Sequence, residues 1–154
     1  MENVLLENYG IKHFKVNELV PKEIYAMYGE GAVQFLDIKA IRVIEFLRED
    51  LGKPVYVNNW DSGGLRQESG YRVPNTKTGG KLSQHKFGRA FDIRVEGMTP
   101  QEVFDYILAN EKKYIAAGLT CMENIKFTPT WNHLDTRAVL DLSKIRIVNP
   151  WASF

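Results

Sequence analysis

A histidine and an aspartate with metal-ligand chemistry lie in the stretch 83–93, on either side of Gly88. His85 and Asp92 offer an imidazole nitrogen and a carboxylate oxygen, which are ligand types of a catalytic zinc centre. Such a centre uses three protein ligands and leaves a fourth position open to water. The stretch therefore supplies two of the three ligands that a catalytic site needs, and Gly88 suits a turn between them.

Asp92 is predicted to project from a β-strand. Residues 89–95 alternate in character, with Phe91, Ile93 and Val95 on one face and Asp92 on the other. A strand would bury the apolar set and leave the carboxylate on the opposite face. An aspartate in that position could bind a metal, accept a hydrogen bond from a loop or face solvent. A third ligand is needed to decide between these interpretations.

The chain contains three histidines, so the candidates for a third ligand are few. Strand alternation over residues 130–136 places His133 on one face together with Trp131 and Asp135. Two short strands and a loop histidine would then form a three-ligand site with an open position. His13 lies in a polar N-terminal segment, and we expect it to be an ordinary surface histidine.

Two motifs carry a resemblance to a known family. Ser-x-His-x-x-Gly-x-Ala-x-Asp at 83–92, followed by Trp-x-His-x-Asp at 131–135, resembles the M15-type zinc peptidases. These include D-Ala-D-Ala carboxypeptidases and L-alanyl-D-glutamate endopeptidases, and their fold is related to the hedgehog signalling domain. Ser-Gly-Tyr-Arg at 69–72 is similar to the family's Ser-x-Tyr-Arg element. The resemblance spans residues 55–137, and the compact chain resembles phage-encoded members.

The resemblance implies a ligand set and a substrate. His85, Asp92 and His133 would bind one zinc ion, and the family suggests a peptidoglycan stem peptide as the substrate. Two bonds compete as the cleavage site, L-Ala–D-Glu within the stem and D-Ala-D-Ala at its end. Imidazole and carboxylate ligands would also accept other divalent ions. The predicted function is therefore that of a zinc metallopeptidase and peptidoglycan hydrolase, in a phage lysis or wall-degrading role.

The long glycine-rich segment 61–82 leads into His85 and is predicted to form a substrate-binding wall. Arg72 in this segment would pair with a substrate carboxylate, because its planar guanidinium can bind one bidentately. A structural salt bridge is the alternative for Arg72, and Arg66 is a second candidate for the substrate. Ser83, at the start of the zinc motif, is also predicted to contact the substrate.

The general base is the point at which the sequence departs from the family pattern. Many members place an acidic residue three positions before the last histidine ligand, where this chain has Thr130. Glu123 is our first candidate for the catalytic base, because adjacent antiparallel strands would bring it close to His133. Asp135 is the second candidate, although it could instead orient a ligand through a hydrogen bond.

Three other interpretations of the same residues stay open. The departure at Thr130 also fits a zinc-stabilised, non-catalytic binding domain of the same fold. A second alternative is that His85 and His133 never meet and no metal binds. Cys121 is the only cysteine, which excludes an internal disulfide and a cysteine zinc cluster. A thiol nucleophile assisted by a histidine is conceivable, but we expect Cys121 to be a small buried residue.

Composition limits the partners. The chain has 154 residues, a formal net charge of +1, 44% hydrophobic residues and 25% charged residues, as in an ordinary globular domain. This balance gives no reason to expect a nucleic acid or membrane partner, and we expect a monomer. Acidic residues stand within residues 1–8, where a signal peptide would carry positive charge. We therefore expect synthesis in the cytoplasm without a signal peptide and action on the cell wall after release or delivery.

The expected fold is an α+β domain, with a small, mostly antiparallel sheet, helices packed on one side and the zinc site on the other. We predict one peptidase domain over residues 1–154. Its parts would be a helical N-terminal region at 16–51, a metal-site core at 54–137 and a C-terminal tail at 138–154. The predicted helices are 16–28, 32–51 and 99–117, and the predicted strands are 53–60, 89–95, 119–127 and 130–136. Residues 145–148 would add an edge strand or lie on the core.

Overall fold

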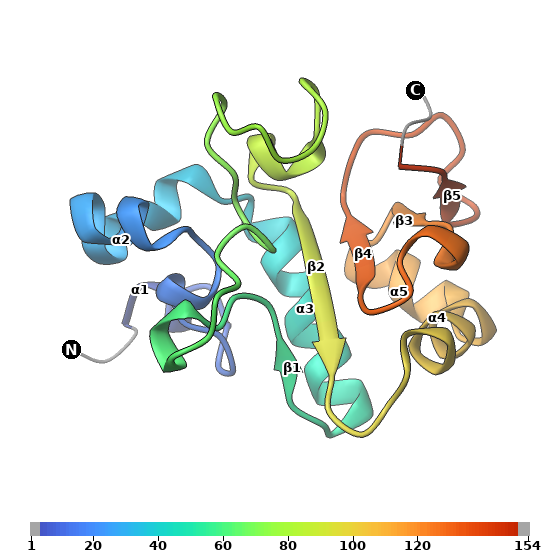
Figure 1. Ribbon diagram of the computed structural model, residues 1–154. Helices are drawn as coiled ribbons and strands as arrows, with labels where there is room; N and C mark the ends of the chain where they lie inside the picture. The colour runs from blue at the N-terminus through green and yellow to red at the C-terminus, as the bar shows by residue number, and fades with distance from the viewer. Residues whose placement is uncertain (1–3, 151–154) are drawn as a thin grey trace.

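A computed structural model describes residues 4–150 and shows an α+β fold built around one mixed sheet (Figure 1). The strand order is β1-β2-β4-β3-β5. The pairs β1–β2, β2–β4 and β4–β3 are antiparallel, and β3–β5 is parallel. The strands are β1 (Val55–Tyr56), β2 (Ala90–Val95), β3 (Cys121–Glu123), β4 (Asn132–Asp135) and β5 (Arg146–Val148). The expected fold class is confirmed.

Helices cover one face of this sheet. The α-helices are α1 (Val4–Glu7), α2 (Lys22–Tyr28), α3 (Ile38–Leu51), α4 (Pro100–Ala109) and α5 (Glu111–Ala117). In Figure 1, α3 and α5 lie behind the sheet, whereas α1 and α2 lie to one side, beyond β1. Short 3-10 helices occupy Val16–Glu18, Gly29–Phe35, Trp60–Ser62, Gln84–Phe87 and Ile125–Phe127. Within residues 4–150, no helix has the length and apolar character needed to cross a membrane.

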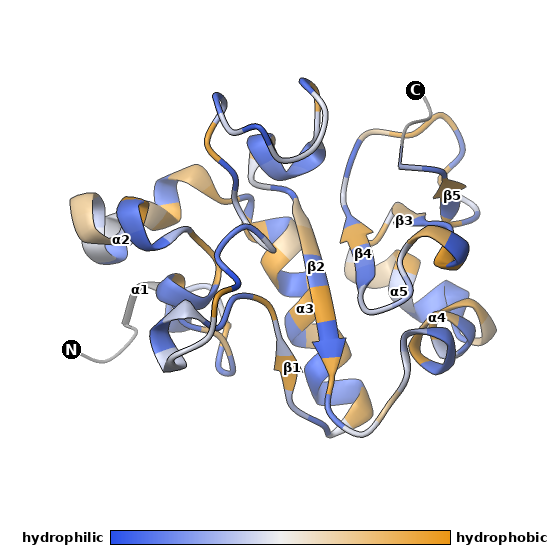
Figure 2. Cartoon of the chain, in the orientation of Figure 1, coloured by the Kyte–Doolittle hydropathy of each residue, from blue (hydrophilic) through white to orange (hydrophobic). Residues whose placement is uncertain are grey.

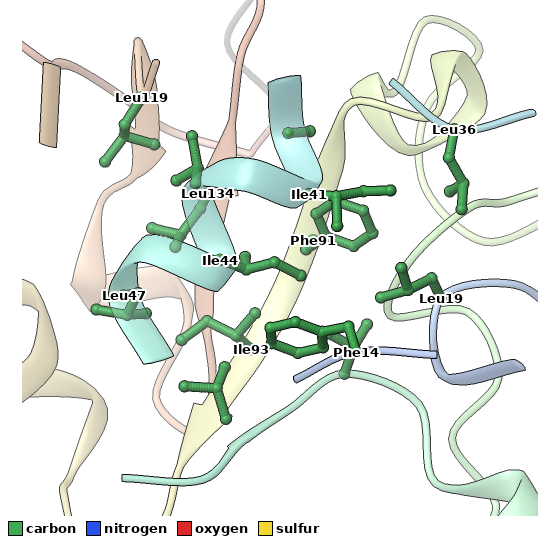
Figure 3. Close-up of a cluster of buried hydrophobic side chains, with 14 of the residues drawn as sticks. Phe14, Leu19, Leu36, Ile41, Ile44, Leu47, Phe91, Ile93, Leu119 and Leu134 are labelled. Atoms are coloured by element: carbon green, nitrogen blue, oxygen red, sulfur yellow. The ribbon is translucent and has the colours of Figure 1, made fainter. Parts of the chain in front are cut away.

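The core lies between α3 and the sheet. Phe91 and Ile93 of β2 and Leu134 of β4 point toward the helix, where they meet its apolar side chains (Figure 3). On α3 these are Ile41, Ile44 and Leu47, all fully buried. Burying a side chain of this size contributes about 1.5–3 kcal/mol. Figure 2 shows the alternation of apolar and polar residues along β2 that the sequence predicted, which leaves the opposite face free for a polar site.

The helix boundaries correct three predictions. Residues 32–37 are not α-helical, because α3 begins at Ile38 after its N-cap Asp37, which accepts a hydrogen bond from the Lys39 amide at 2.9 Å. The predicted helix 16–28 is divided into a 3-10 turn at Val16–Glu18 and α2. Pro21 is the N-cap of α2, and a helix continuing through it would lose a backbone hydrogen bond. The predicted helix 99–117 starts correctly after the Thr99 cap but is interrupted at Asn110.

The strands are shorter than the sequence suggested. Only residues 55–56 of the predicted strand 53–60 pair with β2, and residues 125–127 form a 3-10 helix rather than the end of a strand. The tail does contribute an edge strand, because β5 pairs with β3. Residues 151–154 of the predicted tail lie outside the described part of the chain.

Candidate metal centre

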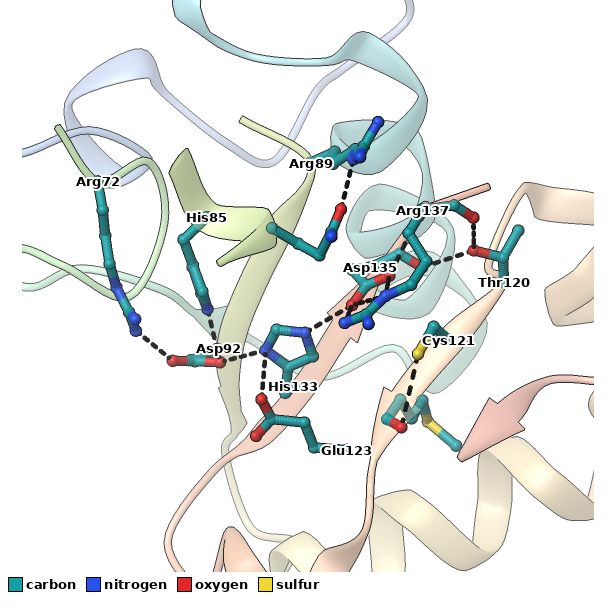
Figure 4. Close-up of polar contacts among 12 residues, drawn as sticks. Arg72, His85, Arg89, Asp92, Thr120, Cys121, Glu123, His133, Asp135 and Arg137 are labelled. Atoms are coloured by element: carbon teal, nitrogen blue, oxygen red, sulfur yellow. Dashed lines mark hydrogen bonds and ion pairs between the residues drawn. The ribbon is translucent and has the colours of Figure 1, made fainter. Parts of the chain in front are cut away.

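The register between β2 and β4 brings two of the predicted ligands together. Asp92 pairs with His133 across the two antiparallel strands. Both side chains project from the face opposite the core, and His133 Nδ1 lies 3.0 Å from Asp92 Oδ1 (Figure 4). Both residues are buried. Neighbours on adjacent strands lie close enough for direct side-chain contact, so the alternation predicted from sequence produces this pair.

His85 reaches the same carboxylate from a 3-10 helix that precedes β2. The helix, Gln84–Phe87, ends at Gly88, whose φ of 71° lies in the left-handed region. A Cβ atom at Gly88 would overlap the Phe35 carbonyl oxygen, so the motif requires glycine here. His85 Nε2 lies 3.2 Å from Asp92 Oδ1, and the His85 side chain is 3% exposed. One carboxylate oxygen therefore faces both imidazole rings.

Hydrogen bonds select the ring nitrogens that can bind a metal. His85 Nδ1 lies 2.8 Å from the Gly70 carbonyl oxygen and must donate its proton there, which leaves Nε2 as the ligand atom. His133 Nε2 lies 2.7 Å from Asp135 Oδ2, which leaves Nδ1 as the ligand atom. The ligand atoms of the three residues all lie within 4.8 Å of one another. Two nitrogens and a carboxylate oxygen fit a three-ligand zinc site.

The charges around His133 favour a cation at its Nδ1 atom. Burial lowers the pKa of His133, but hydrogen bonds to Asp135 and Asp92 outweigh it and raise the pKa to about 10. Burial raises the pKa of Asp92, whereas His85 and His133 lower it, so that its pKa lies far below the usual range. A carboxylate that stays ionised in a buried site is a suitable metal ligand.

Arg72 contacts the ligand set directly. Its Nη2 atom lies 3.0 Å from Asp92 Oδ2, and its Nε atom donates to the Glu68 carbonyl at 2.6 Å. The sequence left a substrate carboxylate and a structural salt bridge as the two interpretations of Arg72, and the structure contains the salt bridge. Arg72 therefore holds Asp92 so that Oδ1 faces the imidazoles.

The three candidate ligands line an open hollow of about 740 Å³, which we call the site hollow. Its size is typical of small-molecule and peptide sites. Ser83, Glu123 and Trp131 also line it. Glu123 Oε1 lies 3.6 Å from His133 Nδ1, and burial raises the pKa of Glu123, partly offset by His133. A carboxylate next to the ligand atom, with a raised pKa, has the properties of a general base.

Asp135 occupies a different position from Glu123. It is 1% exposed and contacts the far nitrogen of His133. Arg137 holds both of its carboxylate oxygens, with Nη2 2.6 Å from Oδ2 and Nε 2.9 Å from Oδ1. Burial raises the pKa of Asp135, but the hydrogen bonds with His133 and Arg137 lower it to about 2. Asp135 is thus arranged to orient His133, and it does not line the site hollow.

Arg137 was not a candidate on sequence grounds. The available signal was its place two residues after Asp135, because strand alternation would put both on one side. Thr130 is exposed in the turn before β4 and does not line the site hollow.

The remaining cysteine and histidine, Cys121 and His13, do not line the site hollow. Cys121 of β3 is fully buried, as expected, and burial together with Asp135 raises the pKa of its thiol to about 12. A thiol in this state is a poor nucleophile. His13 is an exposed histidine, as expected, and its Nδ1 atom lies 2.8 Å from Glu45 Oε1.

Comparison with known proteins identifies one family. The family model described as Peptidase M15 matches residues 12–128, about three quarters of the chain. The match contains His85 and Asp92 and ends before His133, so the third ligand depends on the strand register described above. No curated protein and no solved structure matches the chain. The likeness to the hedgehog domain and to phage enzymes therefore stays a prediction.

Proposed function

Because the chain belongs to the peptidase M15 family, whose members are zinc-dependent peptidases, we propose that it hydrolyses a bond in peptidoglycan stem peptides. The candidate bonds are L-Ala–D-Glu and D-Ala-D-Ala, and the role would be phage lysis or wall degradation. One observation carries the proposal: His85 Nε2, His133 Nδ1 and Asp92 Oδ1 converge at the wall of a hollow large enough for a peptide. Zinc bound there supplies Lewis-acid chemistry, by which water is acidified and a carbonyl polarised.

Glu123 is the proposed general base. It would accept a proton from the attacking water and return it to the leaving amine. Its contact with His133 Nδ1 at 3.6 Å and its place on the site hollow support this role. Asp135, the other candidate, contacts the opposite ring nitrogen and is held by Arg137, so we assign it the orientation of His133. The acid missing at Thr130 is then replaced from the neighbouring strand β3.

Arg72 and Ser83 would contact the substrate at the rim of the site hollow. Arg72 is bound to Asp92, so it offers the substrate only the donors that this salt bridge leaves free. We propose one peptidase domain over residues 1–154, because the tail strand β5 pairs with β3, the strand that carries Glu123. The helical part at 16–51 and the metal-site core at 54–137 would share the core described above.

Mass spectrometry of muropeptides tests the proposal. Purified peptidoglycan is incubated with the zinc-loaded protein or with His133→Ala as the control. A new stem peptide beginning at D-Glu would identify an endopeptidase, and loss of terminal D-Ala would identify a carboxypeptidase. A wild-type protein that binds zinc but leaves muropeptides unchanged would favour the non-catalytic binding domain.

A further inference from the structure

A second hollow adjoins the site hollow on the side of Arg137. It has a volume of about 330 Å³, and we call it the side pocket. Leu82, Gln84 and Arg137 line both hollows, so the two are adjacent. Arg89 and Arg146 also line the side pocket. Figure 4 shows Arg137 on the opposite side of His133 from Arg72.

Positive charge in the side pocket is only partly neutralised. Three arginines line it and no acidic residue does. Arg137 is paired with Asp135, but Arg89 makes its side-chain hydrogen bond to the neutral Gln84, at 2.5 Å. Among residues 4–150 no carboxylate pairs with Arg89 or Arg146. Arg89 and Arg146 are both half-buried, and they line the side pocket without a carboxylate within ion-pair distance among the described residues; an acidic residue, Asp37, lines a neighbouring hollow that Arg89 also lines.

The walls of the side pocket combine this charge with apolar surface. Phe87 and Leu82 contribute exposed hydrophobic side chains, and the Arg89 guanidinium lies 5.0 Å from the centre of the Phe87 ring. A guanidinium against an apolar wall binds a carboxylate more strongly than one in open solvent, because the local dielectric constant is lower. The stem peptide carries the matching groups, since it contains alanine methyl groups and a glutamate carboxylate.

Arg72 is not free to bind the glutamate carboxylate of the substrate with its whole guanidinium group. Its guanidinium is held by Asp92 and by the Glu68 carbonyl. We propose that the side pocket is a carboxylate subsite of the substrate cleft, in which Arg89 and Arg146 bind the free carboxylate of the stem-peptide glutamate. This inference rests on the proposed function and adds to it a group of the stem peptide that the enzyme recognises in addition to the cleaved bond.

Substrate amidation provides the sharpest test. Hydrolysis of two synthetic stem peptides is compared, one with the glutamate carboxylate free and one with it amidated. Arg146→Gln is the informative variant, because its side chain makes no hydrogen bond within the described residues and its loss leaves β5 pairing intact. We expect this variant to raise KM about tenfold on the free-acid peptide with kcat little changed. On the amidated peptide, wild type and variant should be equal.

Lys22→Gln on α2 is the matched control, since it removes one exposed positive charge far from the cleft. It should leave both peptides unaffected. An equal loss on both peptides for Arg146→Gln would show a structural role, and no loss on either would show that the pocket does not contact the carboxylate. Both results overturn the proposal.

Phosphodiester wall polymers are the competing anion, because three further basic residues line a neighbouring hollow together with one acidic residue, Asp37; the three are Lys39, Arg42 and Lys144. Binding of such a polymer that depends on Arg146, with unchanged peptide kinetics, would also overturn the proposal.

If the wild type cleaves neither peptide, the proposed function fails. Fluorescence anisotropy of the labelled peptides then tests the subsite by itself: the free acid should bind the wild type about tenfold more tightly than it binds Arg146→Gln, and equal binding would contradict the inference.

Discussion

Two clusters of histidine and carboxylate side chains occur in the described part of this chain, and only one is arranged as a catalytic centre. His85, Asp92 and His133 lie at the wall of the site hollow, while His13, Glu45 and Glu49 lie near the N-terminal segment. Both clusters bring ligand-type atoms within 4.8 Å of one another. Residue type and proximity alone therefore do not distinguish them.

The difference lies in what else binds the ligand atoms. Glu45 accepts hydrogen bonds from the backbone amides of Lys12 and His13, at 2.9 and 3.1 Å, and from the His13 ring at 2.8 Å. Both of its oxygens therefore hold the N-terminal segment against α3. In the other cluster, the outward ring nitrogens are bonded to Gly70 and Asp135, and the inward nitrogens converge on Asp92. A metal site is recognised by atoms that neighbouring groups leave available.

Metal removal should separate the two clusters most strongly. A chelator is expected to lower peptidase activity by roughly three orders of magnitude, because the Lewis acid supplies several kcal/mol of transition-state stabilisation. One equivalent of zinc should restore it. The His13→Ala variant should respond in the same way as the wild type. Activity that survives chelation would contradict the assignment.

Glu123→Gln removes the proposed base and keeps the shape of the site. We expect kcat to fall about 10²–10⁴-fold, because a general base contributes an effect of this size. Zinc content, measured by elemental analysis, should stay at the wild-type value, since Glu123 is not among the three ligands. A kcat equal to that of the wild type would show that Glu123 is not the general base.

Asp135→Asn tests the orientation of His133. Loss of the charge opposite His133 Nε2 is expected to weaken zinc affinity or activity about 10–100-fold. The variant Arg137→Gln should produce a smaller effect in the same direction, because Asp135 keeps its bond to His133. Competition with a zinc-binding dye measures the affinities. An affinity unchanged in Asp135→Asn would show that Asp135 does not support the ligand.

The second cluster should affect stability and leave catalysis unchanged. Glu45→Ala leaves two backbone amides and the His13 ring without their acceptor, and we expect a loss of about 1–3 kcal/mol in the free energy of unfolding. Urea denaturation measures this change. Zinc content and kcat should equal those of the wild type. A lower zinc content in this variant would mean that the two clusters are less distinct than their contacts indicate.

The sequence predicted that His85, Asp92 and His133 would lie together, because local patterns encode their positions. Strand alternation puts Asp92 and His133 on faces opposite the core, and the helix and strand types around them follow from the same periodicity. The position of Glu123 beside His133 could also be predicted, because it required only that their strands be neighbours and antiparallel. The ring nitrogens that face the candidate metal site could not be predicted, because they depend on the contacts of Gly70 and Asp135 with the two rings.

The errors have two physical origins, local breaks in the helical backbone and contacts between distant segments. Periodicity over 16–28 looks helical, but Pro21 breaks the backbone hydrogen-bond pattern and leaves Val16–Glu18 as a separate 3-10 turn. The interruption at Asn110 has no strong sequence signal, although its side chain donates to the Tyr106 carbonyl at 2.8 Å and ends α4. The salt bridge of Arg72 and the parallel β5 strand join segments far apart in sequence, which periodicity does not report.

Native mass spectrometry of the zinc-titrated protein tests the central claim most directly. We expect the wild type and His13→Ala to bind one zinc ion per chain with equal affinity, and His133→Ala to lose that ion while circular dichroism shows a folded protein. Retention of tight zinc binding by His133→Ala, or its loss in His13→Ala, would contradict the assignment of the metal centre to His85, Asp92 and His133.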